Sequence, residues 1–202
     1  MSSGGVELSV PMATDDRRGT GGMMLLIATE AALFVVLFFA YFYLAREQRL
    51  WPMDAPPHLP LALGMTGVLV TSSAALHFAT RLCKSGKRGW ARFALAMTIL
   101  LGAAFMTGQA LEYREHLRTL KPTTDAYGSI FYTITSVHGL HLVVGLLMLL
   151  YVFMLPGFGG SDEPPHRPLH NASLYWHFVD VVWLFIVGVL YLLPHLTRGG
   201  PP

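Results

Sequence analysis

Five long apolar runs, separated by short polar segments, dominate the chain. A helix needs about 20 mostly apolar residues to cross a bilayer. Backbone groups in lipid must be bonded within the protein, which favours helices. The pattern therefore predicts an all-α integral membrane bundle of five transmembrane helices, at about residues 21–45, 60–82, 91–112, 127–155 and 173–196.

The runs make one transmembrane domain, residues 21–197, with a polar N-terminal tail at 1–20 and a C-terminal tail at 198–202. The first twenty residues are not a short apolar core behind a basic start, so we expect no cleavable signal. Basic residues in the loops, above all the segment RLCKSGKRGWAR at 81–92, set the orientation. They predict the N-terminus inside and the C-terminus outside.

Composition agrees with a membrane protein. The chain is 53% hydrophobic and only 13% charged, whereas soluble domains carry about 25% charged residues. The net charge of +2 is small, and no basic cluster is interleaved with aromatics, so we expect no nucleic-acid partner. Cys83 is the only cysteine, which excludes an intrachain disulfide and a cysteine-based metal site.

Glu30 is an ionisable residue inside the first apolar run. Such a group costs about 2.5–3.5 kcal/mol on insertion scales, so its presence needs a reason. At about 1.5 Å per residue it lies near the middle of the membrane. Two readings stay open: a protonatable carboxyl with a function, or a neutral, hydrogen-bonded structural acid.

His138 and His141 lie three residues apart in the fourth run and share a helix face. A His-x-x-His pair can bind zinc or iron if a third ligand is present, and Glu30 is a candidate. A di-iron bundle would also need a second such motif on another span, and the sequence has none. The alternative, which we favour, is two neutral imidazoles that form hydrogen bonds across helices and to lipid or water, with no metal.

His177 and Asp180, also three apart, allow a contact within the fifth run. Because the fourth and fifth helices are antiparallel, Glu30, His141, His177 and Asp180 are expected to meet in one polar network in the inner half of the bundle. The simplest role of such a network is structural, namely to hold the helices in their packed arrangement. Six other residues are expected to be structural or interfacial: Gln109, Glu112 and Tyr113 near the outer surface, Tyr175 and Trp176 in an aromatic belt near the inner edge, and Trp183 on the stripe of Asp180.

Four phrases in order carry a family resemblance: TEAALFVVLFFAYFY at 29–43, GQALEY at 108–113, HGLHLVVG at 138–145 and YWHFVDVVWLF at 175–185. Over about residues 20–197 the chain resembles the haem-copper oxidase subunit III family, in its short five-helix bacterial form without the first two helices of seven-helix members. In that family the segment that contains the carboxyl residue often begins with serine, whereas in this chain it begins with Thr29, directly before Glu30.

The resemblance implies a non-catalytic subunit in a bacterial inner membrane, multi-pass, bound directly to oxidase subunit I and in a complex with subunit II and other subunits. It implies haem and copper in partner chains and none here, a cleft that holds phospholipid, and support for proton uptake and turnover stability of subunit I. It assigns to this proton and lipid network the residues Glu30, His138, His141, His177 and Asp180.

Other functions remain open at this point. The leading one is subunit III of a proton-pumping cytochrome c oxidase. The family also includes subunits of quinol oxidases and proteins that accompany nitric oxide reductases. A free-standing metalloenzyme that uses His138, His141 and Glu30 is less favoured. A proton-coupled transporter that uses Glu30 and Asp180 is also less favoured, since no repeat or pair of interrupted half-helices is evident.

Overall fold

The structure, a computed structural model, describes residues 13–47, 51, 59–116, 126–158 and 165–198. Within these ranges every regular element is helical: α1 (Ala13–Glu47), α2 (Leu59–Lys84), α3 (Arg88–His116), α4 (Ala126–Met154), the 3₁₀-helix η1 (Pro156–Phe158), α5 (His166–Ile186), the π-helix η2 (Val187–Leu192) and α6 (Leu193–Arg198). Five of the described helices are long and apolar enough to span a membrane, with α5, η2 and α6 forming the fifth span to Leu196. The predicted five-helix membrane bundle is confirmed, and the orientation of its ends stays a prediction.

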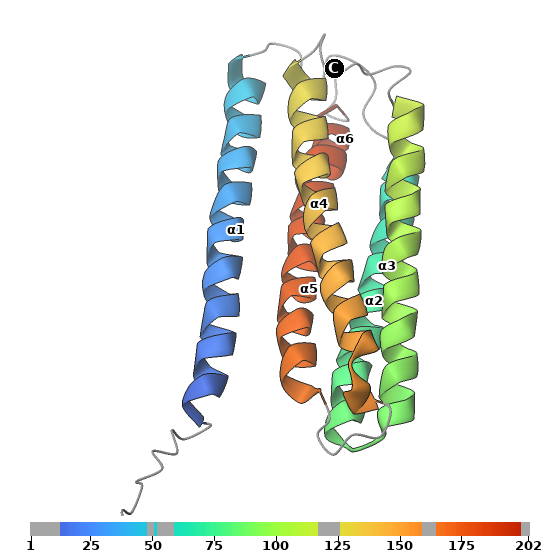
Figure 1. Ribbon diagram of the computed structural model, residues 1–202. Coiled ribbons are helices and arrows are strands. Elements are labelled where there is room, and N and C mark those ends of the chain that lie inside the picture. The colour runs from blue at the N-terminus through green and yellow to red at the C-terminus, as the bar shows by residue number, and fades with distance from the viewer. Residues whose placement is uncertain (1–12, 48–50, 52–58, 117–125, 159–164, 199–202) are drawn as a thin grey trace, which may run out of the picture.

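The helices run up and down in chain order (Figure 1). α2 and α3 pack against each other, α5 contacts both α2 and α4, and α1 packs against α4 and α5 at one side of the bundle. Many large apolar side chains of α1 remain exposed, including Leu25, Val35 and Phe39. These positions face lipid or a neighbouring chain, because an exposed apolar face is the expected surface of a membrane helix.

A glycine makes the tight turn between α2 and α3 possible. Gly86 has φ +75°, a conformation that costs an L side chain energy. Its N–H donates to the carbonyl of Cys83, and the N–H of Lys87 donates to the carbonyl of Leu82. This pair of bonds is a Schellman motif, which satisfies the last carbonyls of α2 and lets α3 begin at Arg88.

α5 begins earlier than the sequence predicted. We expected the fifth helix to start at residue 173, but it starts at His166. Pro165 is the N-cap residue and Pro168 lies in the first turn. The N–H groups of a first turn have no acceptor within the helix, so a proline there loses no helical hydrogen bond. The prolines that suggested a loop therefore belong to the helix start. α1 likewise includes residues 13–20, which we had assigned to the N-terminal tail, and residues 1–12 lie outside the described part.

Pro194 explains why the fifth span changes from α-helix to π-helix. A proline inside a helix lacks an N–H and its ring clashes with the carbonyl four residues earlier. Here that carbonyl belongs to Leu190, and it accepts a hydrogen bond from the Tyr127 hydroxyl at 3.3 Å. The carbonyl of Val189 accepts one from Tyr41 at 3.3 Å. Tyrosines on α4 and α1 thus bond to carbonyls of the π segment.

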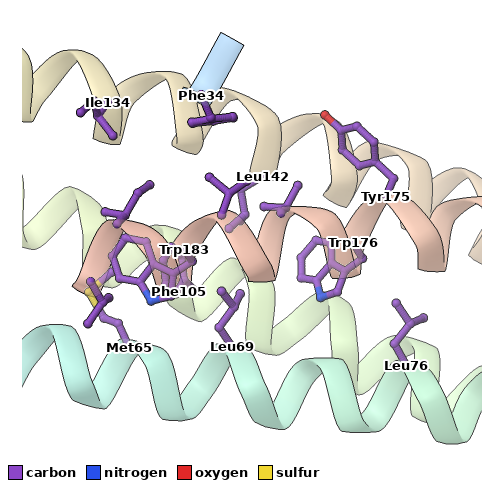
Figure 2. Close-up of a cluster of buried hydrophobic side chains, with 14 of the residues drawn as sticks. Phe34, Met65, Leu69, Leu76, Phe105, Ile134, Leu142, Tyr175, Trp176 and Trp183 are labelled. Atoms are coloured by element: carbon purple, nitrogen blue, oxygen red, sulfur yellow. The ribbon is translucent and has the colours of Figure 1, made fainter. Parts of the chain in front are cut away.

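The core centres on two tryptophans of α5 (Figure 2). Trp176 fits between two glycines: a Cβ on Gly102 of α3 would lie 2.6 Å from its Cη2, and a Cβ on Gly145 of α4 would lie 3.0 Å from its Cε3. The rings of Trp176 and Tyr175 are buried, so the predicted aromatic belt at these positions is wrong. The reason is the early start of α5, which moves both residues away from the membrane edge.

Candidate functional site

Glu30 and His141 are in hydrogen-bond contact between α1 and α4. Oε2 of Glu30 lies 2.9 Å from Nε2 of His141, and Nδ1 of His141 lies 2.7 Å from the carbonyl oxygen of Val137. Both residues are close to the midpoints of their spans, Gly19–Glu47 and Ala126–Met154. The Phe34 ring packs edge-on against the imidazole, with centroids 5.0 Å apart.

The geometry of this pair fixes how many protons it holds. A carbonyl oxygen can only accept, so Nδ1 of His141 carries a proton and donates it to Val137. The contact between Nε2 and Oε2 then needs one further proton between them. With that proton on Glu30 the pair is neutral, and with it on His141 the pair is an imidazolium and a carboxylate. In both forms the net charge is zero, which suits a low-dielectric site.

His138 has a different environment from His141. Its ring is fully buried, stacks on Trp183 at 5.3 Å between centroids, and meets the edges of Phe105 and Phe34. Neither ring nitrogen has a hydrogen-bond partner among the described residues. His138 therefore does not share the Glu30 contact, and within the described residues no three His, Cys, Asp or Glu side chains form a group able to hold a metal ion.

A second polar group joins α2 to α5. Ser73 donates a hydrogen bond to Oδ2 of Asp180, and its Oγ lies 2.7 Å from Nδ1 of His177. Nδ1 of His177 is 3.7 Å from Oδ2 of Asp180. Ser73 thus bridges the histidine and the carboxylate that the sequence paired directly. These side chains line a hollow of about 250 Å³ together with Leu69, Val70, Val181, Trp183 and Leu184.

The structure separates the polar residues that we expected in one network. Within the described residues, no hydrogen bond or ion pair joins the Glu30–His141 pair to the Ser73–His177–Asp180 group. The longer α5 also places His177 and Asp180 near the middle of the span His166–Leu196, not in its inner half. The expected single network is therefore two local groups, one on each side of α5.

Further polar contacts lie toward the end of the bundle that contains η2 and the last turns of α3. The Tyr191 hydroxyl donates to Oε1 of Glu112 at 2.9 Å, and both residues are buried. The Tyr113 hydroxyl donates to Oγ1 of Thr135 at 2.6 Å. Gln109 is buried, and its amide has no partner among the described residues. Glu112 and Tyr113 thus connect α3 to η2 and to α4.

Sequence reasoning missed the small hydroxyl residues of α2. Nε1 of Trp183 donates to Thr66 at 3.0 Å and Nε1 of Trp176 donates to Ser72 at 3.2 Å. Together with Ser73, which contacts His177 and Asp180, these residues join α2 to four polar side chains of α5. The available signal was the recurrence of hydroxyl residues, with Thr66 and Ser73 seven positions apart on one helix face and Ser72 beside them. Polar side chains of this kind stabilise helix contacts in membranes.

Comparison with known proteins decides the family. The family model for cytochrome c oxidase subunit III matches residues 16–194. The chain belongs to the cytochrome c oxidase subunit III family. Proteins named cytochrome c oxidase subunit 3 are similar throughout most of the chain: that of Synechocystis sp. is 34% identical, covering 85% of this chain and 74% of that protein. That of Bacillus sp. (strain PS3) is 33% identical, with 85% and 84% covered, and that of Gallus gallus is 36% identical, with 84% and 67% covered.

Membership in this family identifies the chain as a subunit of a membrane-bound respiratory oxidase complex. The four sequence segments that indicated the subunit III family, between residues 29 and 185, all lie inside the matched range of 16–194. The conclusion agrees with five membrane-spanning helices and with the polar groups buried between them.

Proposed function

We propose that this chain is the non-catalytic subunit III of a proton-pumping cytochrome c oxidase, multi-pass in a bacterial inner membrane. It binds subunit I directly, with subunit II and other subunits in the same complex, and the haem and copper belong to partner chains. The observation that carries the proposal is the family match over residues 16–194 together with the Glu30–His141 pair.

The Glu30–His141 pair supports a part in proton uptake. It holds one proton between Oε2 and Nε2, and the Glu30 side chain is 29% exposed. The carboxyl is therefore open at the surface of α1 to exchange of that proton with a carrier in a neighbouring chain, while His141 stays bonded to Val137. We propose that this exchange sustains proton delivery to subunit I during turnover.

A groove between α1, α4 and α5 supports lipid binding. It has a volume of about 430 Å³ and is lined mainly by apolar side chains, including Met23, Leu147 and Tyr151. A groove of this shape and chemistry fits part of an acyl chain, since lipid tails are as apolar as the side chains. We propose that a phospholipid occupies it and steadies α1 against the bundle.

The test is a gentle purification through a tag on this chain, followed by a reduced-minus-oxidised optical spectrum and metal analysis. We expect haem and copper to arrive with larger subunits and to be absent from this chain once it is stripped away. Iron or zinc retained by the isolated chain would overturn the proposal.

A further inference from the structure

A polar hollow of about 280 Å³ lies between α1, α2 and α5, at the end of the bundle where α1 and α5 begin and α2 ends (Figure 1). No acidic residue lines it in the described part of the chain. Six side chains in its wall can donate a hydrogen bond: Thr20, Lys84, His166, Arg167, His170 and Asn171. The hollow is therefore rich in donors and carries positive charge.

The positive charge comes from two different helices. Lys84 is the last residue of α2, and Arg167 is the second residue of α5. The Lys84 ammonium has no hydrogen-bond or ion-pair partner in the described part of the chain. Like charges in one hollow repel each other, and a hollow lined by one sign of charge attracts the opposite sign. The hollow thus favours an anionic ligand.

The start of α5 adds to this preference. The first N–H groups of a helix have no acceptor within it, and the helix dipole favours an anion beside them. Pro165 is the N-cap residue, and no side-chain hydrogen bond caps this end. Nδ1 of His166, in the same turn, is buried and has no partner among the described residues. An anion in the hollow can take the place of the missing cap.

Asn171 is oriented by its contact with α1. Oγ1 of Thr20 lies 3.4 Å from Oδ1 of Asn171 and donates a hydrogen bond to it. A Cβ on Gly19 would lie 3.8 Å from Nδ2 of the same amide. Because Oδ1 accepts from Thr20, Nδ2 keeps its two protons for another acceptor. The amide therefore serves the hollow as a donor.

The level of the hollow in the membrane matches the phosphate layer of a bilayer. Gly19 and His166 begin their membrane spans, and Lys84 ends its span. The hydrocarbon core is about 30 Å thick and the headgroup regions extend to about 40–45 Å, so phosphate groups lie at the ends of the spans. An arginine can bind two oxygens of one phosphate, and a lysine adds a point charge. Level and donor set together favour phosphate as the anion.

We propose that the hollow formed by Lys84, Arg167, His170 and Asn171 is a binding site for a phosphate group. Arg167 and Lys84 neutralise its charge, while the Asn171 amide and the first turn of α5 donate to its remaining oxygens. The phosphate belongs to a phospholipid or is a soluble phosphate at the membrane surface. The site differs from the apolar groove of α1, α4 and α5, although Asn171 borders both. The inference uses only groups of this chain, so it does not depend on the oxidase assignment.

Two lysines three residues apart provide a matched test. Lys84→Gln removes a cation from the hollow, whereas Lys87→Gln removes the same charge from a residue that does not line it. Both lysines are exposed, so neither substitution is expected to disturb folding. Lys84→Arg keeps the charge, and Arg167→Gln removes the second cation.

Binding is measured in two ways on the chain purified through a tag with the partners that accompany it. Native mass spectrometry counts the phospholipids that the particle retains. Equilibrium dialysis in a neutral detergent and phosphate-free buffer measures the binding of labelled inorganic phosphate. We expect about tenfold weaker binding in Lys84→Gln and in Arg167→Gln, the effect of losing one charge-assisted hydrogen bond. Lys84→Arg and Lys87→Gln are expected to bind as the wild type does.

The measurement that responds identifies the source of the phosphate. A phospholipid lost from Lys84→Gln and Arg167→Gln but kept in Lys87→Gln supports the site with a lipid as its ligand. Weaker binding of inorganic phosphate in the same two variants, with an unchanged lipid count, supports the site with a soluble phosphate. An equal loss in Lys87→Gln would show a diffuse basic surface and overturn the site. The same lipid count and phosphate binding in all variants would also overturn it.

Discussion

Oε2 of Glu30 and Nε2 of His141 lie 2.9 Å apart, although 111 residues separate them in the chain. The contact joins α1, at the side of the bundle, to α4 (Figure 1). Because one proton is shared between the two side chains, it can move between Glu30 and His141 with no change in net charge, whereas its loss would leave the pair with a charge of −1. This property connects the fold to the proposed part in proton uptake.

Glu30→Gln is expected to separate the structural use of this contact from its proton exchange. The Gln amide still donates to Nε2 of His141, so assembly and haem content should remain. The exchangeable proton is lost, so sustained turnover, proton pumping or lipid occupancy should change. Oxidase activity followed over many turnovers checks this, with Glu30→Asp as the variant that keeps a carboxyl. Wild-type turnover, pumping and lipid content in Glu30→Gln would remove the carboxyl from the mechanism.

His138→Leu is expected to be tolerated or stabilising. The imidazole is fully buried against Trp183, Phe105 and Phe34, and its nitrogens have no partner among the described residues. Replacing an unsatisfied buried polar group by an apolar one of similar size removes a desolvation cost of about 1–3 kcal/mol. Thermal denaturation in detergent checks this. His141→Leu serves as the comparison, since it breaks the Glu30 contact and should destabilise.

Gly102→Ala is expected to destabilise the bundle. The added Cβ would lie 2.6 Å from Cη2 of Trp176 and 2.8 Å from Cδ2 of Leu146, and the other side of the indole is already in contact with Gly145. Overpacking of this kind costs about 1–3 kcal/mol. Gly139→Ala is the control, because its Cβ has open space. A thermal midpoint in Gly102→Ala equal to that of the control would contradict the close packing around Trp176.

Tyr191→Phe is expected to cost about 1.5–3 kcal/mol if Glu112 is ionised and about 1 kcal/mol if it is neutral, since hydrogen bonds to charged groups are the stronger ones. The variant removes the 2.9 Å bond from η2 to the buried Glu112 of α3. Tyr151→Phe, on an exposed side chain of α4, is the control. Denaturation of both variants in the same detergent makes the comparison, and equal stability would show that the Tyr191 bond contributes nothing.

The sequence by itself determined the five spans, the family and the position of Glu30 near the middle of the first span. These features are local: hydropathy over about 20 residues and short phrases suffice to read them. The same local reading misplaced the start of α5, because prolines mark both loops and first helical turns.

Only the tertiary structure decided which polar groups pair. His138 and His141 differ by about 60° around α4, since a helix has 3.6 residues per turn. That rotation turns His141 toward Glu30 of α1 and His138 into the aromatic core. Likewise, Ser73 bridges His177 and Asp180 because α2 and α5 pack with these positions facing one another. The rotation and depth of one helix against its neighbour depend on packing across the whole bundle, and no short stretch of sequence encodes them.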